Sequence, residues 1–467
     1  MLRKAYVGVR LKRLREERGL KQAELAQALG LSGSYLNQLE RNQRPLTVPV
    51  LLRINAVFGV DVQLFSEDDE ARLITELREA LSDGAEPVSG PELRELAMNM
   101  PAVSRSLLAL HRRHRDAVER NEAMAAQLGD DWIQAGPPRM PFEQVRDYFH
   151  ARRNHVEPLD AAAEQLYAQA GLAPRSVHAG LQRWLHQQHG ITVEWTEDAT
   201  APRHFQPATR SLHIAAGLRP GQQAFQMATQ LAFLEIGGLI DELVESPILA
   251  GDQARRLARI GLANYFAGAL LLPYAPFLAA AESAAYDIEA LVRHFGVGFE
   301  TICHRLSTLQ RPDARGVPFF FVRVDRAGNI SKRQSATDFH FSRVGGSCPL
   351  WNVYEAFAQP GRVLTQQAQM PDGRTYLWVA RTVGQRGPAY GAPGKNFAIG
   401  LGCDIRHAHR LVYSRGMNLT DPAGAIPIGA GCKVCERPAC AQRAFPPIGR
   451  NIVADENRSS TTPYPVA

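Results

Sequence analysis

The first 65 residues combine apolar side chains at helical spacing with glycines that divide them into short helices. Gly19 ends the first helix, Gly30 supplies the tight turn after the second, and Ser32 caps the third. Helices this short need one another to bury their apolar faces, so the sequence predicts an all-α bundle. The second, third and fourth helices are predicted over residues 21–29, 33–41 and 48–58.

The excess positive charge of the chain lies in the same segment. Residues 1–65 contain 11 Lys and Arg against 5 Asp and Glu, a net charge of +6. The whole chain also carries +6, so the remaining residues are neutral together. This concentration of charge favours attraction to a phosphate backbone.

The head, residues 1–65, resembles the helix-turn-helix of phage repressors, and the matching residues are Gln22, Leu25, Ala26, Gly30, Ser32, Tyr35, Leu36, Leu39, Glu40 and Pro45. The resemblance implies that the exposed side of the third helix reads base edges in the major groove, while basic and amide groups hold phosphates. One head reads one half-site, so we expect a homodimer or higher oligomer on a near-palindromic double-stranded operator. The DNA-binding candidates are Gln22, Ser32, Ser34, Tyr35, Asn37, Gln38, Arg41 and Arg44.

Residues 66–140 read as a helical connector. The charged run at 111–120 favours a solvated helix face, with a second DNA contact as the alternative. The apolar positions could instead serve a dimer interface. They are Leu93, Leu96, Met100, Val103, Leu107 and Leu110.

Residues 141–312 contain the segment QLAFLEIGGLID (230–241), expected to form one helix. A zinc-peptidase helix carries His-Glu-x-x-His, but Leu234 and Gly238 occupy the two histidine positions and only Glu235 remains. Strands are predicted at 191–195 and 211–215, and helices over 142–171 and 261–273. This order resembles the ImmA/IrrE zinc peptidases through Glu235, Ala263, Asn264, Phe266, Ala267, Leu271 and Pro273.

The third zinc ligand of that family, an acid shortly before the Ala-Asn pair, is also missing. A catalytic zinc needs three protein ligands and an open position, so we expect no catalytic residues and no enzyme activity. The emptied site is more apolar and suits an aliphatic group. A core position for Tyr265 is the alternative to ligand contact. The ligand-binding candidates are Tyr265, Arg183, Leu234 and Gly238.

Residues 313–450 contain five of the six cysteines. Cys432 and Cys435 form a Cys-x-x-Cys pair, Cys440 adds a third thiol, and Cys403 is the first choice for a fourth ligand, with Cys348 second. The spacing suits Zn²⁺ or an iron–sulfur cluster and does not separate them, and ordinary reduced cysteines are the alternative. Strands are predicted at 317–325, 375–383 and 397–404, and residues 451–467 as a disordered tail.

The segments 340–357, 370–381 and 429–447, taken with the head and middle domain, resemble the short-chain fatty acyl-CoA regulators of bacteria. The resemblance implies a transcription regulator of propionate or acetate metabolism with an acyl-CoA effector on the middle domain and a 4Fe–4S cluster on the cysteines. A redox or iron sensor and an active repressor-cleaving zinc peptidase are the alternatives. Operator, sign of regulation and acyl length stay open.

The sequence therefore predicts a multidomain α+β protein. It has an all-α head, a helical connector, a zincin-like α+β middle domain and an α+β cysteine domain. No apolar run approaches the roughly 20 residues that a membrane helix needs, so we expect a cytoplasmic protein with no membrane partner.

Overall fold

The structure is a computed structural model, and it describes residues 8–41, 43–58, 67–81, 88–128, 141–197, 201–335, 348–385, 390–392, 394–447, 450–453 and 456–466. The chain forms two compact units. The N-terminal unit comprises Met1–Pro137, Asp338–Gly345 and Ala430–Ala467, and the central unit comprises Pro138–Thr337 and Gly346–Gly429. The predicted boundary between residues 312 and 313 thus falls inside the central unit, and the C-terminal segment groups with the head and connector.

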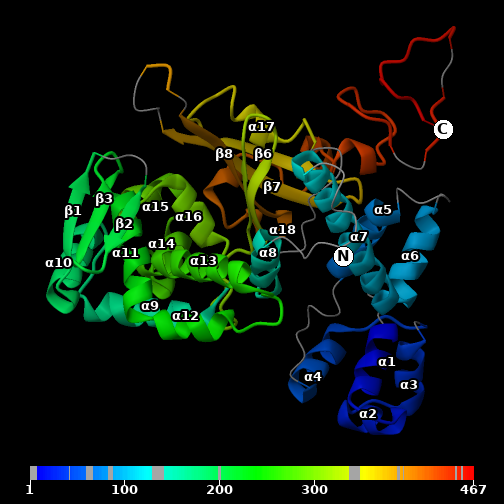
Figure 1. The fold of residues 1–467 in the computed structure, drawn as a ribbon. Coiled ribbons are helices and arrows are strands. Elements are labelled where there is room, and N and C mark those ends of the chain that lie inside the picture. Colours follow the sequence, from blue (N-terminus) through cyan, green and yellow to red (C-terminus); the bar gives the residue numbers. More distant parts are fainter. Residues whose placement is uncertain are drawn as a thin grey trace. The chain divides into compact units, whose positions relative to one another are not determined.

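The head consists of four helices, as predicted, and the ends of the second, third and fourth helices lie within one residue of the predicted ends (Figure 1). Its core is made of leucines that are almost fully buried, including Leu11, Leu25 and Leu36. Gly19 and Gly30 have positive φ, +66° and +63°, which favours glycine at both turns. The helices are α1 (Gly8–Glu17), α2 (Gln22–Ala28), α3 (Gly33–Glu40) and α4 (Val48–Phe58).

The connector forms a second small core in the N-terminal unit. Leu77 and Leu93 are buried there together with Leu108. Arginines of the charged run bond glutamates of the neighbouring helix, for example Arg112 Nη2 to Glu76 Oε2 at 3.1 Å. The helices are α5 (Glu67–Leu81), α6 (Gly90–Asn99) and α7 (Pro101–Leu128).

The C-terminal segment of the N-terminal unit begins with the cysteine loop, residues 430–447, which contains the short turn η4 (Cys432–Val434). Arg78 of α5 pairs with Glu436 of this loop at 2.9 Å. Ile452 and Val466 form a β-bridge, so the segment predicted as a disordered tail closes into a loop.

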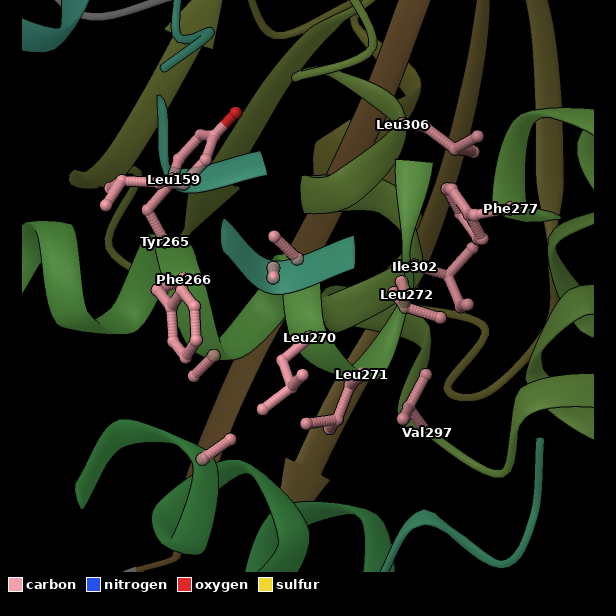
Figure 2. Packing of buried hydrophobic residues seen from close by; sticks show 14 of the residues in the cluster. Leu159, Tyr265, Phe266, Leu270, Leu271, Leu272, Phe277, Val297, Ile302 and Leu306 are labelled. Carbon is pink, nitrogen blue, oxygen red and sulfur yellow. The ribbon is translucent and has the colours of Figure 1, made fainter. Parts of the chain in front are cut away.

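The helical part of the central unit is built around α13, which is buried along most of its length (Figure 2). Leu270, Leu271 and Leu272 pack there with Ile302 and Leu306. The helices are α8 (Pro141–Ala151), α9 (Glu157–Gln169), α10 (Val177–His189), α11 (Pro220–Glu235), α12 (Gly237–Val244), α13 (Asp252–Leu271), α14 (Tyr274–Ser283), α15 (Ile288–Phe295) and α16 (Phe299–Leu306).

A three-stranded sheet of order β1-β3-β2 lies beside these helices, with β1 (Thr192–Thr196) parallel to β3 (Ser211–Ala215). The edge strand β2 (Arg203–Gln206) is antiparallel to β3. The two predicted strands are present. The predicted helix over 142–171 is wrong as one element, because Arg153 and Asn154 adopt positive φ and separate α8 from α9.

A six-stranded sheet of order β5-β4-β8-β7-β6-β9 completes the central unit. Phe321, Val379 and Leu401 lie on the face that joins the same core as the helices, so the middle segment and this sheet share one core. The opposite face packs Trp351 against Trp378, with ring centroids 4.6 Å apart. The elements are β4 (Phe320–Val324), β5 (Ile330–Ser335), α17 (Asn352–Glu355), β6 (Leu364–Gln369), β7 (Thr375–Gln385), β8 (Lys395–Asp404), α18 (Ile405–Ala408), η2 (Val412–Ser414), η3 (Pro422–Gly424) and β9 (Ile426–Pro427).

No single helix in the described part of the chain is both long and apolar enough to cross a bilayer. The consecutive helices α13 and α14 meet the length and composition criteria only as a pair bent by 59°.

Candidate functional site

The predicted DNA-reading residues gather on α3 and the turn that follows it. Ser32 caps α3, because its Oγ accepts a hydrogen bond from the Tyr35 backbone N–H at 3.2 Å. Ser34 is exposed, and Tyr35, Asn37 and Gln38 are half-exposed. Both arginines of the turn, Arg41 and Arg44, are exposed, and the Arg44 guanidinium lies 5.8 Å from the Tyr35 ring centroid.

A buried carboxylate holds this surface in place. Glu40 at the end of α3 accepts hydrogen bonds from Arg15 Nε of α1 at 2.7 Å and from Gln22 Nε2 of α2 at 2.8 Å. The bond with Glu40 raises the pKa of Arg15, while burial acts in the opposite direction. Gln22 also reaches Asn37 Oδ1 at 3.5 Å. The Glu40 carboxylate therefore links three helices. The sequence pattern did not show that Arg15 is one of its partners.

The predicted helix over residues 230–241 is wrong, because the chain breaks within it. Helix α11 ends at Glu235, Ile236 adopts φ −123° and ψ 22°, and α12 starts at Gly237. A β-branched residue followed by two glycines disfavours continuation of a helix. The two emptied positions therefore lie on different helices. Leu234 on α11 is half-buried against the core, and Gly238 on α12 is exposed.

Glu235, the remaining residue of the peptidase pattern, is held by α10. Its Oε1 accepts a hydrogen bond from Trp184 Nε1 at 2.9 Å and contacts His189 Nε2 at 2.8 Å. Arg210 donates to the His189 backbone carbonyl at 2.9 Å. The predicted ligand residue Arg183 is on the same helix α10 and is exposed. The carboxylate is thus bound by side chains of the fold.

Tyr265 belongs to a buried polar network. Its hydroxyl donates to Asp160 Oδ2 at 2.7 Å and accepts from the Val156 N–H at 3.1 Å. Asp160 also accepts from Arg305 Nη2 at 2.6 Å. Burial and the Asp160 carboxylate raise the pKa of Tyr265 well above its ordinary value. The hydroxyl is engaged in this conformation, which supports the core alternative for Tyr265.

Arg203 is a cation that the sequence pattern did not single out. It lies half-buried on the edge strand β2, its guanidinium is 5.7 Å from the Phe233 ring centroid, and Nη1 donates to the Gln226 carbonyl at 3.4 Å. Burial lowers the pKa of Arg203. None of the described carboxylates pairs with it. A partly desolvated cation over α11 can bind an anionic group.

The cysteine loop wraps around one guanidinium. Arg443 is 4% exposed and donates to the carbonyls of Cys432 at 2.9 Å, Cys435 at 3.0 Å and Arg437 at 2.6 Å, while its Nε has no hydrogen-bond partner among the described residues. Cys432 and Cys435 are buried, and Cys440 is half-exposed. Burial raises the pKa of Cys435, and the charges of Arg443 and Arg437 oppose that shift.

The predicted fourth ligands belong to the central unit. Cys403 on β8 is fully buried in its apolar core, which raises the pKa of the thiol, and Cys348 is also buried. All six cysteines are free thiols. Within the described ranges, no three His, Cys, Asp or Glu side chains are grouped as a metal site.

Family models match three parts of the chain. A model described as the C-terminal part of the short-chain fatty acyl coenzyme A regulator matches residues 308–464. An IrrE N-terminal-like domain model matches residues 186–307, and a helix-turn-helix model matches residues 11–65.

Curated relatives match along the whole chain. The HTH-type transcriptional regulator PrpR of Mycobacterium tuberculosis is 53% identical over 99% of this chain and 96% of its own length. RamB of the same species is 53% identical over 99% of this chain and 98% of its own length. The propionyl-CoA carboxylase regulator of Cereibacter sphaeroides is 43% identical over 100% of both chains. A solved structure of a Mycobacterium tuberculosis transcriptional regulator has a TM-score of 0.68 at 56% identity and covers 70% of this chain and 99% of its own. The chain therefore belongs to the short-chain fatty acyl coenzyme A regulators, a family of helix-turn-helix transcription regulators.

Proposed function

We propose that the chain regulates genes of propionate or acetate metabolism and that a short-chain acyl-CoA, bound by the central unit, sets its operator affinity. Full-length similarity to a protein named propionyl-CoA carboxylase regulator carries this proposal. The effector acts by binding one conformation of the regulator more tightly than the other, which shifts the fraction able to bind the operator.

The former peptidase site acts in this proposal as a binding site without catalysis. Leu234 and Gly238 cannot ligate zinc, and Glu235 is already engaged by Trp184 and His189. A zinc-dependent cleavage of any protein by the purified chain, abolished by Glu235→Gln, would overturn this part. The sites for the CoA phosphates include Arg203, because it is a cation without a carboxylate partner among the described residues.

Calorimetry of the full chain with acetyl-, propionyl- and butyryl-CoA tests the proposal. We expect at least one to bind and to change operator affinity in a fluorescence-anisotropy titration. Arg203→Gln should weaken acyl-CoA binding about ten-fold, because a charge-assisted bond to phosphate is lost. Arg315→Gln, an exposed arginine of the same unit, is the matched control. No heat of binding with any of the three thioesters contradicts the proposed effector.

We also propose that Cys432, Cys435 and Cys440 provide three ligands for Zn²⁺ or a 4Fe–4S cluster. The donor set fits: three thiols share one loop with Lys433, Arg437 and Arg443, whose charges offset those of thiolates. A bound cluster would supply sensitivity to oxidants. Arg443 would keep the loop in shape by holding the carbonyls of two ligand residues. This feature supports redox or iron sensing as the second candidate function.

Metal analysis after anaerobic purification tests the cysteine site. Arg443→Met removes the donor to four backbone carbonyls, so metal affinity should fall about ten- to hundred-fold, as it does when groups that orient metal ligands are lost. Arg458→Gln, an exposed arginine of the same unit, should leave the metal content unchanged. Absence of both zinc and iron from the unmodified chain contradicts the site.

We further propose that the regulator is a homodimer that pairs along α7. The predicted apolar positions separate into two groups. Leu93 is in the connector core and Leu96 packs against it, whereas Val103 and Leu110 are 54% and 59% exposed. Val118, 41% exposed, adds apolar surface at the edge of this stripe.

The spacing of the stripe supports a second copy of α7 as its partner. Leu107, His114 and Ala117 complete a three-and-four repeat with the exposed residues, and the sequence continues it at Asn121, Met124 and Leu128. This repeat is typical of helices that pair in a coiled coil. A single asparagine at such a position fixes the register of the two helices. The helix has 28 residues and is about 42 Å long, enough for a stable pair.

A further inference from the structure

Lysine is rare in this chain. Among 53 basic residues only six are lysines, at positions 4, 12, 21, 332, 395 and 433. The described lysines at 12, 21 and 395 are exposed, whereas Lys332 and Lys433 are half-buried, and only Lys332 of these two is on a strand of the central unit. A half-buried lysine in a chain that otherwise uses arginine marks a position whose chemistry arginine does not share.

Lys332 lies between the sheet and helix α16. It is directly opposite Arg323 in the antiparallel pair of β4 and β5, so both side chains are on one face. Arg323 Nη1 pairs with Glu300 of α16 at 2.9 Å. Two residues along β5, Gln334 accepts a hydrogen bond from Ser307 Oγ at 3.0 Å. Lys332 is therefore held between two contacts that fasten β4 and β5 to α16.

The amino group of Lys332 has no hydrogen-bond or ion-pair partner among the described residues. Glu300, the carboxylate whose charge acts on this amine, is already bonded to Arg323. Burial lowers the pKa of Lys332 to about 8, and the charge of Arg323 adds to this effect while Glu300 opposes it. A larger fraction of this amine is consequently neutral at physiological pH than of an exposed lysine.

The imidazole of His304 packs on the same face of the sheet as Lys332. His304 is four residues after Glu300, on the same side of α16, and its ring packs edge-on against Phe321 with centroids 5.6 Å apart. Burial lowers the pKa of His304 well below its ordinary value, and the positive charge of Lys332 contributes. An unprotonated imidazole on the same face can accept the proton that the amine loses as it attacks.

We propose that Lys332 is a covalent acylation site, where a short-chain acyl-CoA thioester transfers its acyl group to Nζ. The neutral amine attacks the thioester carbonyl, the C–N bond forms and the C–S bond breaks. The proton lost from nitrogen passes through His304 or water to the departing CoA thiolate. The products are an amide and free CoA thiol, with no change of oxidation state.

This inference rests on the proposed function, because the effector is the acyl donor. Acylation differs from reversible effector binding, because the amide persists after the effector dissociates. Acylation removes one positive charge beside the Glu300–Arg323 pair and places an apolar chain between β5 and α16. The modification would record earlier exposure of the regulator to acyl-CoA.

The full chain incubated with propionyl-CoA at neutral pH, followed by peptide mass spectrometry, tests the proposal. We expect Lys332 to be propionylated at least about ten-fold faster than Lys395, the exposed lysine on β8 of the same unit. The rate at Lys332 should level off above about pH 8, whereas the rate at Lys395 should keep rising. Equal or slower modification of Lys332 overturns the proposal. His304→Gln should slow Lys332 alone, with Lys395 in the same sample as the internal control.

Two further measurements separate this proposal from the proposed function. Calorimetric binding of propionyl-CoA with an unmodified Lys332 overturns acylation and leaves the effector role standing. Fast propionylation of Lys332 with unchanged operator affinity supports acylation and counts against the effector role. Lys332→Arg, which keeps the charge, should remove the modified peptide and confirm its assignment.

Discussion

Replacing Asp160 by Asn should destabilise the central unit by about 3–5 kcal/mol. Asp160 is fully buried and accepts hydrogen bonds from Arg305 and Tyr265. Asparagine keeps the shape but leaves the guanidinium of Arg305, itself 3% exposed, without its counter-charge. Urea unfolding followed by tryptophan fluorescence measures the change, because four of the five tryptophans, at 184, 195, 351 and 378, lie in this unit.

The pH dependence of the same variant provides a second test. Burial alone would raise the pKa of Asp160, but Arg305, His155 and Tyr265 together lower it. A carboxyl with a lowered pKa in the folded state stabilises it above the unfolded pKa, and this contribution disappears as the pH falls through the folded pKa. The difference between the unmodified chain and the variant should therefore shrink below about pH 4.

Glu157→Gln is the control for this network. Glu157 pairs with Arg311 at 3.0 Å, but half of its side chain is exposed. Its replacement should change the unfolding free energy by less than about 1 kcal/mol. A similar loss for both variants would contradict the argument, because burial is the property that distinguishes the two carboxylates.

Replacing Val103 and Leu110 together by Asp should convert the regulator to a monomer and weaken operator binding about a hundred-fold. The exposed stripe of α7 would bring four carboxylates into one helix pair, and each freed head would bind its half-site without the other. Analytical ultracentrifugation measures the oligomeric state, and an anisotropy titration measures operator affinity.

Ala102→Asp adds a carboxylate one residue away, on an exposed part of α7 outside the stripe. It should leave both measurements unchanged. A double variant that still sediments as a dimer would show that the subunits pair through another surface. A monomer with unchanged operator affinity would instead separate dimerisation from DNA binding.

The DNA-reading surface was predictable because its determinants are local. Turn glycines, the Ser32 cap and apolar spacing act within a few residues, and the four helices of the head form where these signals place them. Glu40 matched the repressor pattern, but its partner Arg15 is 25 positions away and no spacing rule connects them. The sequence does not reveal the break at Ile236, because helical patterns flank it on both sides. Gly238 there looks like a substitution within one continuous helix.

The cysteine prediction had the same limits. The Cys-x-x-Cys spacing is visible in the sequence, whereas the place of Arg443 within the loop is not. In the structure Arg443 organises the loop by binding its carbonyls, a function that depends on how the chain folds around it. Whether these thiols hold a metal stays a prediction.

The sequence by itself determined the helix-turn-helix head, the loss of the zinc ligands and the order of the main strands. These features depend on residue identity and short-range spacing. Only the tertiary structure decided that the middle segment and the six-stranded sheet share one core, and that Asp160 meets Arg305 across 145 positions. It also placed Lys332 and His304 on one face of the six-stranded sheet. Each of these pairings joins segments distant in the chain, and their energies come from burial and from charges that only folding brings together.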